Sequence, residues 1–185
     1  LKPHQILINT SRGEVVDNKS LKAALQNKTI KAASLDVWEN EPDIDTELME
    51  LLFTATPHIA GYSLDGKANG TWMSVQAIGK KFNLPCKDWK VTEVPNPAQP
   101  VEFCIDLNGK NIDQALDEAI LYTYNIFTDD RRLRENPTEF ELQRADYPIR
   151  REFPAFTVRF TNIDKFQENC DDLTSKIKQF GFICV

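Results

Sequence analysis

The fold is decided by the stretch Ser34-Leu35-Asp36-Val37-Trp38-Glu39-Asn40-Glu41-Pro42. It follows two alanines, and residues 32–37 together predict a buried β-strand that runs out into an acidic loop ending at a proline. Ligands of open parallel sheets bind at the carboxyl ends of the strands. The stretch therefore predicts that Asp36 and Glu41 lie at a ligand-binding edge.

Two further polar residues follow short apolar runs in the same way. Arg12 comes shortly after Ile6-Leu7-Ile8, a run typical of a strand that is buried on both faces, and His58 comes after Phe53-Thr54-Ala55. A helix with an N-cap at Asp17 or Asn18 separates the first two strands, which predicts a parallel βαβ unit. Three neighbouring strand ends would then bring Arg12, Glu41 and His58 to one edge of one sheet.

The rest of the chain predicts a second, smaller α/β region. A helix is expected over residues 64–82 after an N-cap at Ser63, and four prolines make residues 85–100 a linker. Beyond it, alternating apolar residues predict strands near residues 101–107 and 156–160, with a helix between them. A further helix is expected over residues 163–180, followed by a last strand at 182–185. We expect domains at residues 1–84 and 101–185.

Composition limits the partners. The chain of 185 residues carries a formal charge of −6, which argues against nucleic acid and anionic membranes as partners. No apolar run is long enough for a membrane span and no signal peptide opens the chain, so we expect a cytoplasmic protein. The four scattered cysteines favour free thiols over disulfides or a metal site, and no metal is expected.

The three polar residues have complementary chemistry. Arg12 offers a fork of donors that matches a carboxylate, and His58 can exchange the proton of a hydroxyl group near neutral pH. Glu41 could hold the imidazole of His58 by a hydrogen bond, and Asp36 could accept from a ribose hydroxyl or lie beside a nicotinamide ring. Taken singly, each has a structural interpretation: a structural histidine, a turn residue, a surface ion pair and a turn cap. Their occurrence at three successive strand ends favours hydride transfer to or from a 2-hydroxy acid.

A family resemblance supports this interpretation. The segments at residues 7–13, 35–42 and 56–61 are similar, in this order, to motifs of the D-2-hydroxyacid dehydrogenase family. The resemblance implies that Arg12 holds the substrate carboxylate, that His58 is the acid/base supported by Glu41, and that Asp36 and Gly61 line an NAD site. The implied fold is the C-terminal part of a Rossmann-type NAD-binding domain.

The tail adds a finer resemblance. Tyr62 follows Gly61, and the sequence after Pro100 resembles an extra C-terminal dimerisation domain that most relatives lack. This implies a homodimer and a small phosphorylated 2-hydroxy acid as substrate, with Tyr62 among the substrate-binding residues. The arginines at residues 131–151 are interpreted as a solvated ion-pair face, with the alternative that Arg150 or Arg151 holds the substrate phosphate in the partner's site.

The chain also departs from the family. It contains no G-x-G-x-x-G turn for a pyrophosphate, so we expect it to be a fragment of a longer enzyme and, by itself, inactive and a weak binder of NAD. Two alternatives stay open: another D-2-hydroxyacid dehydrogenase, and a non-catalytic scaffold that keeps the fold.

Overall fold

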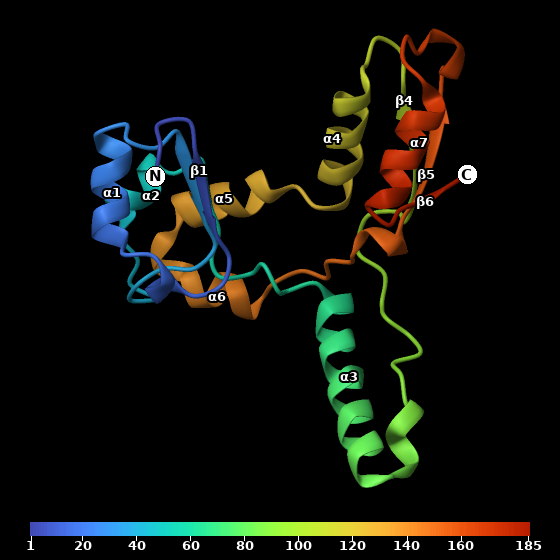
Figure 1. Ribbon diagram of the computed structural model, residues 1–185, viewed down its shortest axis with the longest axis horizontal. Helices are drawn as coiled ribbons and strands as arrows, with labels where there is room; N and C mark the ends of the chain where they lie inside the picture. The colour runs from blue at the N-terminus through green and yellow to red at the C-terminus, as the bar shows by residue number, and fades with distance from the viewer. The chain divides into compact units, whose positions relative to one another are not determined.

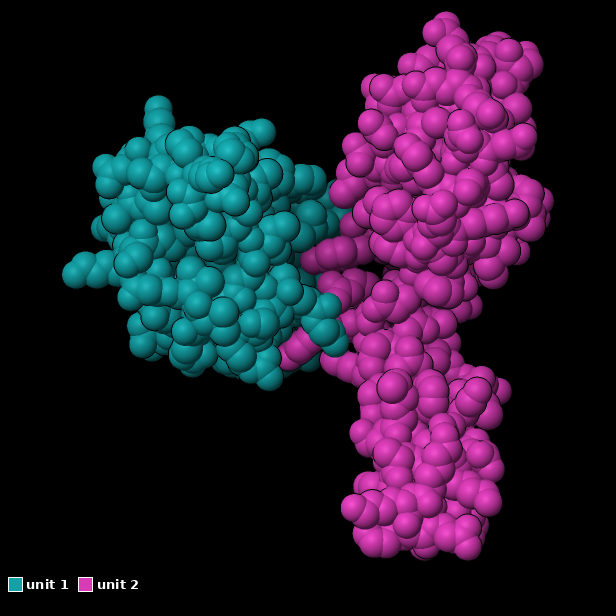
Figure 2. All heavy atoms as spheres, in the orientation of Figure 1, with its two compact units in different colours: residues 1–61, 125–147 teal, residues 62–124, 148–185 magenta.

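A computed structural model describes all residues from 1 to 185. The chain forms two compact units, coloured separately in Figure 2: residues 1–61 with residues 125–147, and residues 62–124 with residues 148–185. The first unit thus contains a segment taken from the middle of the second half of the chain. The expected domain boundary at residues 85–100 stays a prediction.

The first unit is built on a parallel sheet. Its strands β1 (Ile6–Asn9), β2 (Ala32–Leu35) and β3 (Thr54–Ala55) lie side by side in this order, and Asn9 pairs with Leu35, which pairs with Ala55. The predicted βαβ unit is confirmed. Since all three strands run the same way, the loops that follow them leave from one edge.

Two short helices connect these strands. The helix α1 (Asn18–Gln26) begins where the Asp17 carboxylate accepts from the Ser20 N–H at 2.6 Å, after the 3₁₀ turn η1 (Gly13–Val15). The helix α2 (Thr46–Leu51) begins in the same way at Asp45, which accepts from the Leu48 N–H at 3.0 Å. Both carboxylates satisfy donors that a helix start leaves unpaired, so the sequence fixes where each helix begins.

The arginine-rich segment completes the first unit. It forms α5 (Ile126–Glu135), the 3₁₀ turn η3 (Pro137–Glu139) and α6 (Phe140–Ala145). Leu133 and Phe140 are fully buried in the same core as Leu35 and Leu48. The segment is therefore part of the core of this unit and is more than a solvated charged face.

The expectation that the first strand is buried on both faces is wrong for this chain. Ile6 and Ile8 are 57% and 70% exposed, whereas Leu7 packs against the core. The strand is an edge strand of the sheet, and no element of the 185 residues covers the face that carries Ile6 and Ile8. The second strand is also shorter than expected, since it ends at Leu35, although the Asp36 N–H still donates to the Asn9 carbonyl of β1 at 3.0 Å.

The second unit begins with the long helix α3 (Leu64–Phe82), for which the predicted bounds and the Ser63 cap are confirmed. The 3₁₀ turn η2 (Pro85–Asp88) folds back onto it within the expected linker. A Cβ atom on Gly79 would lie 2.7 Å from the backbone of Lys87, so this contact requires glycine.

A second parallel sheet forms the core of this unit (Figure 1). Its strands are β4 (Glu102–Asp106), β5 (Thr157–Thr161) and β6 (Ile183–Cys184), in this order, and α4 (Ile112–Thr123) and α7 (Cys170–Gln179) pack against each other and bury one face of it. The 3₁₀ turn η4 (Phe153–Ala155) precedes β5. The predicted order of strands and helices is confirmed.

The last helix starts later than expected. Residues Ile163–Lys165 form a separate 3₁₀ turn, η5, entered from Asn162 in a left-handed conformation with φ 54°. The helix α7 begins after Asn169, whose side chain accepts from the Asp171 N–H at 2.8 Å. Ile163 and Phe166 continue the apolar spacing of the helix, but the asparagine cap decides where the helix begins.

Two further features concern membrane-spanning helices and the cysteines. No helix combines the length and the apolar composition that crossing a bilayer requires. The cysteines are free thiols, and burial raises the pKa of Cys184.

Candidate active site

Polar residues follow each strand of the first sheet. Arg12 lies three residues beyond β1, Asp36 follows β2 directly, and His58 lies three residues beyond β3. Because the strands are parallel and in register, these residues emerge at one edge of the sheet. This is the edge at which open α/β sheets bind ligands.

Asp36 organises the loop that carries the histidine. The residue is 4% exposed, and its Oδ1 accepts from the Thr56 hydroxyl at 2.6 Å and from the Ile59 N–H at 2.8 Å. Its Oδ2 accepts from the Ala60 N–H at 2.9 Å, and its backbone carbonyl accepts from the His58 N–H at 2.7 Å. The buried charge is thus compensated by donors from both sides of His58.

The structure brings His58 and Glu41 together. The Nδ1 atom of His58 lies 2.7 Å from the Oε2 atom of Glu41, whose Oε1 accepts from the Trp38 N–H at 2.8 Å. A carboxylate only accepts, so Nδ1 carries the proton in this pair and the lone pair of the neutral imidazole is on Nε2. The pair leaves Nε2 as the atom that can take a proton from a bound molecule.

The backbone of His58 is in a strained region. Its φ is +56°, a left-handed conformation that few residues other than glycine adopt. Such a conformation persists only when surrounding contacts fix it. Here the hydrogen bonds of Asp36 and Glu41 fix the backbone and the ring of His58 respectively.

A close backbone contact joins the loops after β1 and β2. A Cβ atom on Gly13 would lie 1.9 Å from the carbonyl oxygen of Trp38, so no other residue fits. The Trp38 indole N–H in turn donates to the Thr56 carbonyl at 3.0 Å and ties the loop after β2 to the loop after β3. The three loops thus form one connected edge.

Arg12 lies on this edge with an exposed side chain. Its guanidinium makes one hydrogen bond, to the Ser11 carbonyl at 2.6 Å, and no ion pair. The buried Asn9 holds the loop by donating to the Arg12 carbonyl and accepting from the Ser11 N–H. No hydrogen bond or ion pair joins Arg12 to Glu41 or His58, and its role stays a prediction.

The two remaining candidates lie next to each other in the chain. No atom comes within 4 Å of a Cβ built on Gly61, which leaves space beside its backbone. The ring of Tyr62 lies under the ammonium group of Lys67, 4.0 Å from ring centre to Nζ. The roles of both residues stay predictions.

Sequence reasoning missed several residues that build the edge: Asn9, Gly13, Trp38 and Thr56. Each lies within or beside a motif that was recognised, but each acts through a contact between loops that are distant in the sequence. Only the polar character of Asn9 and Thr56 at strand ends could have indicated them.

The comparisons with known proteins agree with this geometry. Residues 1–60 match the family described as "D-isomer specific 2-hydroxyacid dehydrogenase, NAD binding domain", and residues 98–173 match a "Domain of unknown function (DUF3410)". The chain is 42% identical to the erythronate-4-phosphate dehydrogenase of Bacteroides thetaiotaomicron over 158 residues, which are 85% of this chain and 42% of that protein.

Other relatives have the same name. The erythronate-4-phosphate dehydrogenase of Porphyromonas gingivalis is 44% identical over 83% of this chain and 40% of its own length, and that of Marinobacter nauticus is 40% identical over 87% and 44%. The chain therefore spans less than half the length of the curated relatives it matches. Residues 1–60 thus match the NAD-binding domain of the D-isomer specific 2-hydroxyacid dehydrogenases, and over more than four fifths of its own length the chain is a homologue of the erythronate-4-phosphate dehydrogenases.

Proposed function

We propose that this chain forms part of an NAD-dependent dehydrogenase that oxidises the 2-hydroxyl group of 4-phospho-D-erythronate to the 2-oxo acid, a step of pyridoxine biosynthesis in the cytoplasm. The observation that carries the proposal is the His58–Glu41 pair at the carboxyl edge of a parallel sheet. The match of residues 1–60 and the names of the relatives support it. The activity is proposed for a protein of the relatives' length.

His58 is the proposed acid/base. With Nδ1–H donating to Glu41, Nε2 would take the proton of the substrate hydroxyl during oxidation and return it in the reverse direction. Glu41 holds the ring in the tautomer that this step needs and stabilises the imidazolium that forms. The two residues therefore act as one unit.

Arg12 is the proposed anchor of the substrate carboxylate. After its one hydrogen bond to the Ser11 carbonyl, the guanidinium keeps further N–H donors for a ligand. The loop that carries Arg12 is held in place by contacts of Asn9 and Gly13. A planar fork binds a carboxylate through two parallel hydrogen bonds and so fixes its orientation. Fixing the carboxylate orients the hydroxyl on the neighbouring carbon toward His58.

The residues present fit the nicotinamide end of NAD. A carboxylate has about four acceptor sites, and three on Asp36 are used, so Oδ2 keeps one for an amide or hydroxyl of the cofactor. The open space beside Gly61 suits a close approach of its backbone. Bound NAD would supply the acceptor for the hydride from C2 of the substrate.

The substrate phosphate is proposed to bind Tyr62 and an arginine of a partner chain in a homodimer. Arg151 is a poor candidate, because its guanidinium donates to both carboxylate oxygens of Asp65 at 2.8 and 3.0 Å and to the Val94 carbonyl at 2.9 Å. The other candidate is Arg150, whose guanidinium lies 4.5 Å from the centre of the Tyr124 ring. Light scattering at tens of micromolar would test the dimer, and a monomer would remove this part of the proposal.

The function is tested by comparing substrates in the complete enzyme. We expect NAD reduction with 4-phospho-D-erythronate, and a much lower kcat/KM with unphosphorylated D-erythronate. Arg12→Lys should raise KM for both, since an ammonium group cannot reproduce the fork. Equal use of both substrates would indicate another D-2-hydroxyacid dehydrogenase, and no turnover with either would indicate a non-catalytic role.

A further inference from the structure

We propose that Asp130 and Arg134 of α5 are positioning residues for His58. They are encoded more than 70 residues after it and lie within the segment that matches a domain of unknown function. The inference rests on the proposed function, because it concerns the residue proposed there as the acid/base. It assigns a task to charged residues that would otherwise be interpreted as a solvated surface.

Asp130 binds the strand that leads to the histidine. Its Oδ1 accepts from the Ala55 N–H at 2.7 Å, and Ala55 is the last residue of β3, three residues before His58. The Leu35 carbonyl of β2 accepts from Thr56 and not from Ala55. The Ala55 N–H therefore points to the open side of the strand, and Asp130 supplies the acceptor that a further strand would otherwise provide.

Arg134 connects this contact to the helix that precedes β3. Its Nε lies 3.1 and 3.0 Å from the two carboxylate oxygens of Asp130. Its terminal nitrogens donate to the carbonyls of Met49 at 2.8 Å and Leu52 at 3.1 Å, at the C-terminal end of α2. One guanidinium thus orients Asp130 and binds two carbonyls at the end of α2, of which the Met49 carbonyl also accepts from the Leu52 N–H.

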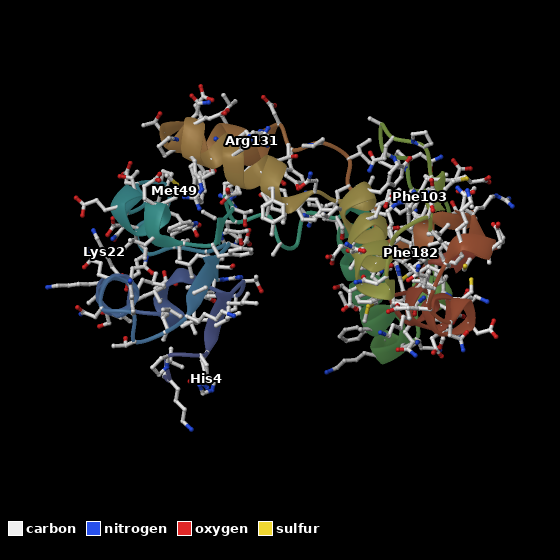
Figure 3. All side chains as sticks on the ribbon, turned by 90° about the horizontal axis from the view of Figure 1, so that it is seen from above. His4, Lys22, Met49, Phe103, Arg131 and Phe182 are labelled. Carbon is white, nitrogen blue, oxygen red and sulfur yellow. The ribbon has the colours of Figure 1, made fainter.

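The helix that carries both residues is firmly packed. Leu133, which lies between them in the sequence, is fully buried. The rings of Phe127 and Phe53 pack edge to face with their centres 6.2 Å apart. Asp130 and Arg134 are themselves only 15% and 23% exposed. Figure 3 shows Met49, whose carbonyl Arg134 binds, on α2, and Arg131 on α5.

This support matters because β3 is short. It has two residues, and the strained backbone of His58 follows after only two more. Asp36 and Glu41 hold the loop after the strand, whereas Asp130 and Arg134 hold the strand and the residues before it. The position of the imidazole relative to Glu41 therefore depends on contacts at both ends of the segment.

The test uses nuclear magnetic resonance on the full 185-residue chain, which contains two histidines. Two-bond ¹H–¹⁵N spectra of the neutral rings report which nitrogen carries the proton, and the exposed His4 serves as an internal reference. Amide hydrogen exchange reports the Ala55 N–H. The variants are Asp130→Ala, Asp130→Asn and, as a matched control on the same helix, Arg131→Ala at an exposed position.

In the unmodified chain and in Arg131→Ala, we expect His58 to carry its proton on Nδ1. In Asp130→Ala, the Ala55 amide should exchange roughly 10- to 100-fold faster, since a hydrogen bond to a charged acceptor is lost. The tautomer of His58 should shift toward that of His4, while the amides of Leu7 and Leu35 keep their protection. Asp130→Asn retains an acceptor oxygen and should restore both signals in large part.

Two results would overturn the inference. A His58 tautomer unchanged in Asp130→Ala would show that the contact does not position the ring. An equal loss of protection at Leu7, Leu35 and Ala55 would show a general role in stability. If Asp130→Ala does not fold, Arg134→Gln decides between the same results. The readout needs no substrate, so an inactive complete enzyme would refute the proposed function and leave this test intact.

Discussion

The two sheets of this chain share an architecture and differ at their strand ends. Each has three parallel strands in sequential order. After β2 the buried Asp36 accepts hydrogen bonds from the loop that follows the next strand. At the end of β4 the exposed Asp106 accepts from the Asn108 N–H at 2.9 Å and from the Asn162 side chain at 2.8 Å.

The difference shows that a parallel sheet by itself makes no site. Both aspartates join two strand ends, but only Asp36 lies beside a histidine, a second carboxylate and an arginine on neighbouring loops. The hydrogen bonds from Asn108 and Asn162 hold the pKa of Asp106 below its usual range, so it stays a turn-forming anion. Chemistry resides in the loops that a fold carries, and the same fold can carry loops without it.

The sharpest way to test this difference is to remove one residue from each sheet's edge in the complete enzyme. His58→Ala should lower kcat by roughly 10²- to 10⁴-fold, because the proton acceptor is lost. Asp106→Asn, the matched change at the other sheet, should leave kcat unchanged. Steady-state assays give both numbers, and full turnover by His58→Ala would exclude it as the base.

The backbone contact between loops is the next test. In Gly13→Ala the new methyl group would overlap the Trp38 carbonyl, so the loops after β1 and β2 must separate. We expect a loss of about 3 kcal/mol in the free energy of unfolding, at the upper end of what overpacking costs. Urea unfolding measures it, and a variant as stable as the unmodified chain would show that this edge is not held by the contact.

The ion pair of the second unit provides a smaller effect with a pH signature. Burial tends to raise the pKa of Asp65, but the hydrogen bonds from Arg151 and the Glu152 N–H and the charge of Arg151 outweigh it and hold the pKa below the usual 3.8. A lowered folded-state pKa stabilises the fold above the ordinary pKa, and this stability is lost as the pH falls through the folded value.

Arg151→Ala should therefore cost about 1–3 kcal/mol near pH 7 and flatten the loss of stability below about pH 4. Thermal unfolding from pH 7 to 2.5 measures both. An unchanged acid profile would mean that the pair does not control the acid stability of this unit.

The smallest effect should be a gain. Gly70 lies exposed within α3, and no atom comes within 4 Å of a Cβ built there. Gly70→Ala should stabilise the helix by about 0.5–1 kcal/mol, because alanine loses less backbone entropy. The same substitution would thus destabilise at Gly13 and stabilise at Gly70, and equal effects at both positions would contradict the argument from contacts.

The motifs of the site were predictable because they are local. Polar residues directly after apolar runs indicated Arg12, Asp36 and His58, and the acidic loop before Pro42 indicated Glu41. Helix starts at Asp17 and Ser63 were also predictable, since a cap acts on backbone donors two or three residues away. The start of α7 was missed, because its apolar spacing extends beyond the residue that caps it.

The sequence by itself determined the parallel βαβ unit, the order of the elements and the residue types at the strand ends, since each follows from short-range spacing. Only the tertiary structure decided that residues 125–147 pack into the first unit, that Asp130 binds the N–H of Ala55, and that Gly13 meets Trp38. The exposed Ile6 and Ile8 also show what the sequence could not determine. An apolar side chain indicates that its burial is favourable but not which element covers it. A contact between distant segments depends on the shapes of both segments, and these shapes cannot be predicted from a local sequence pattern.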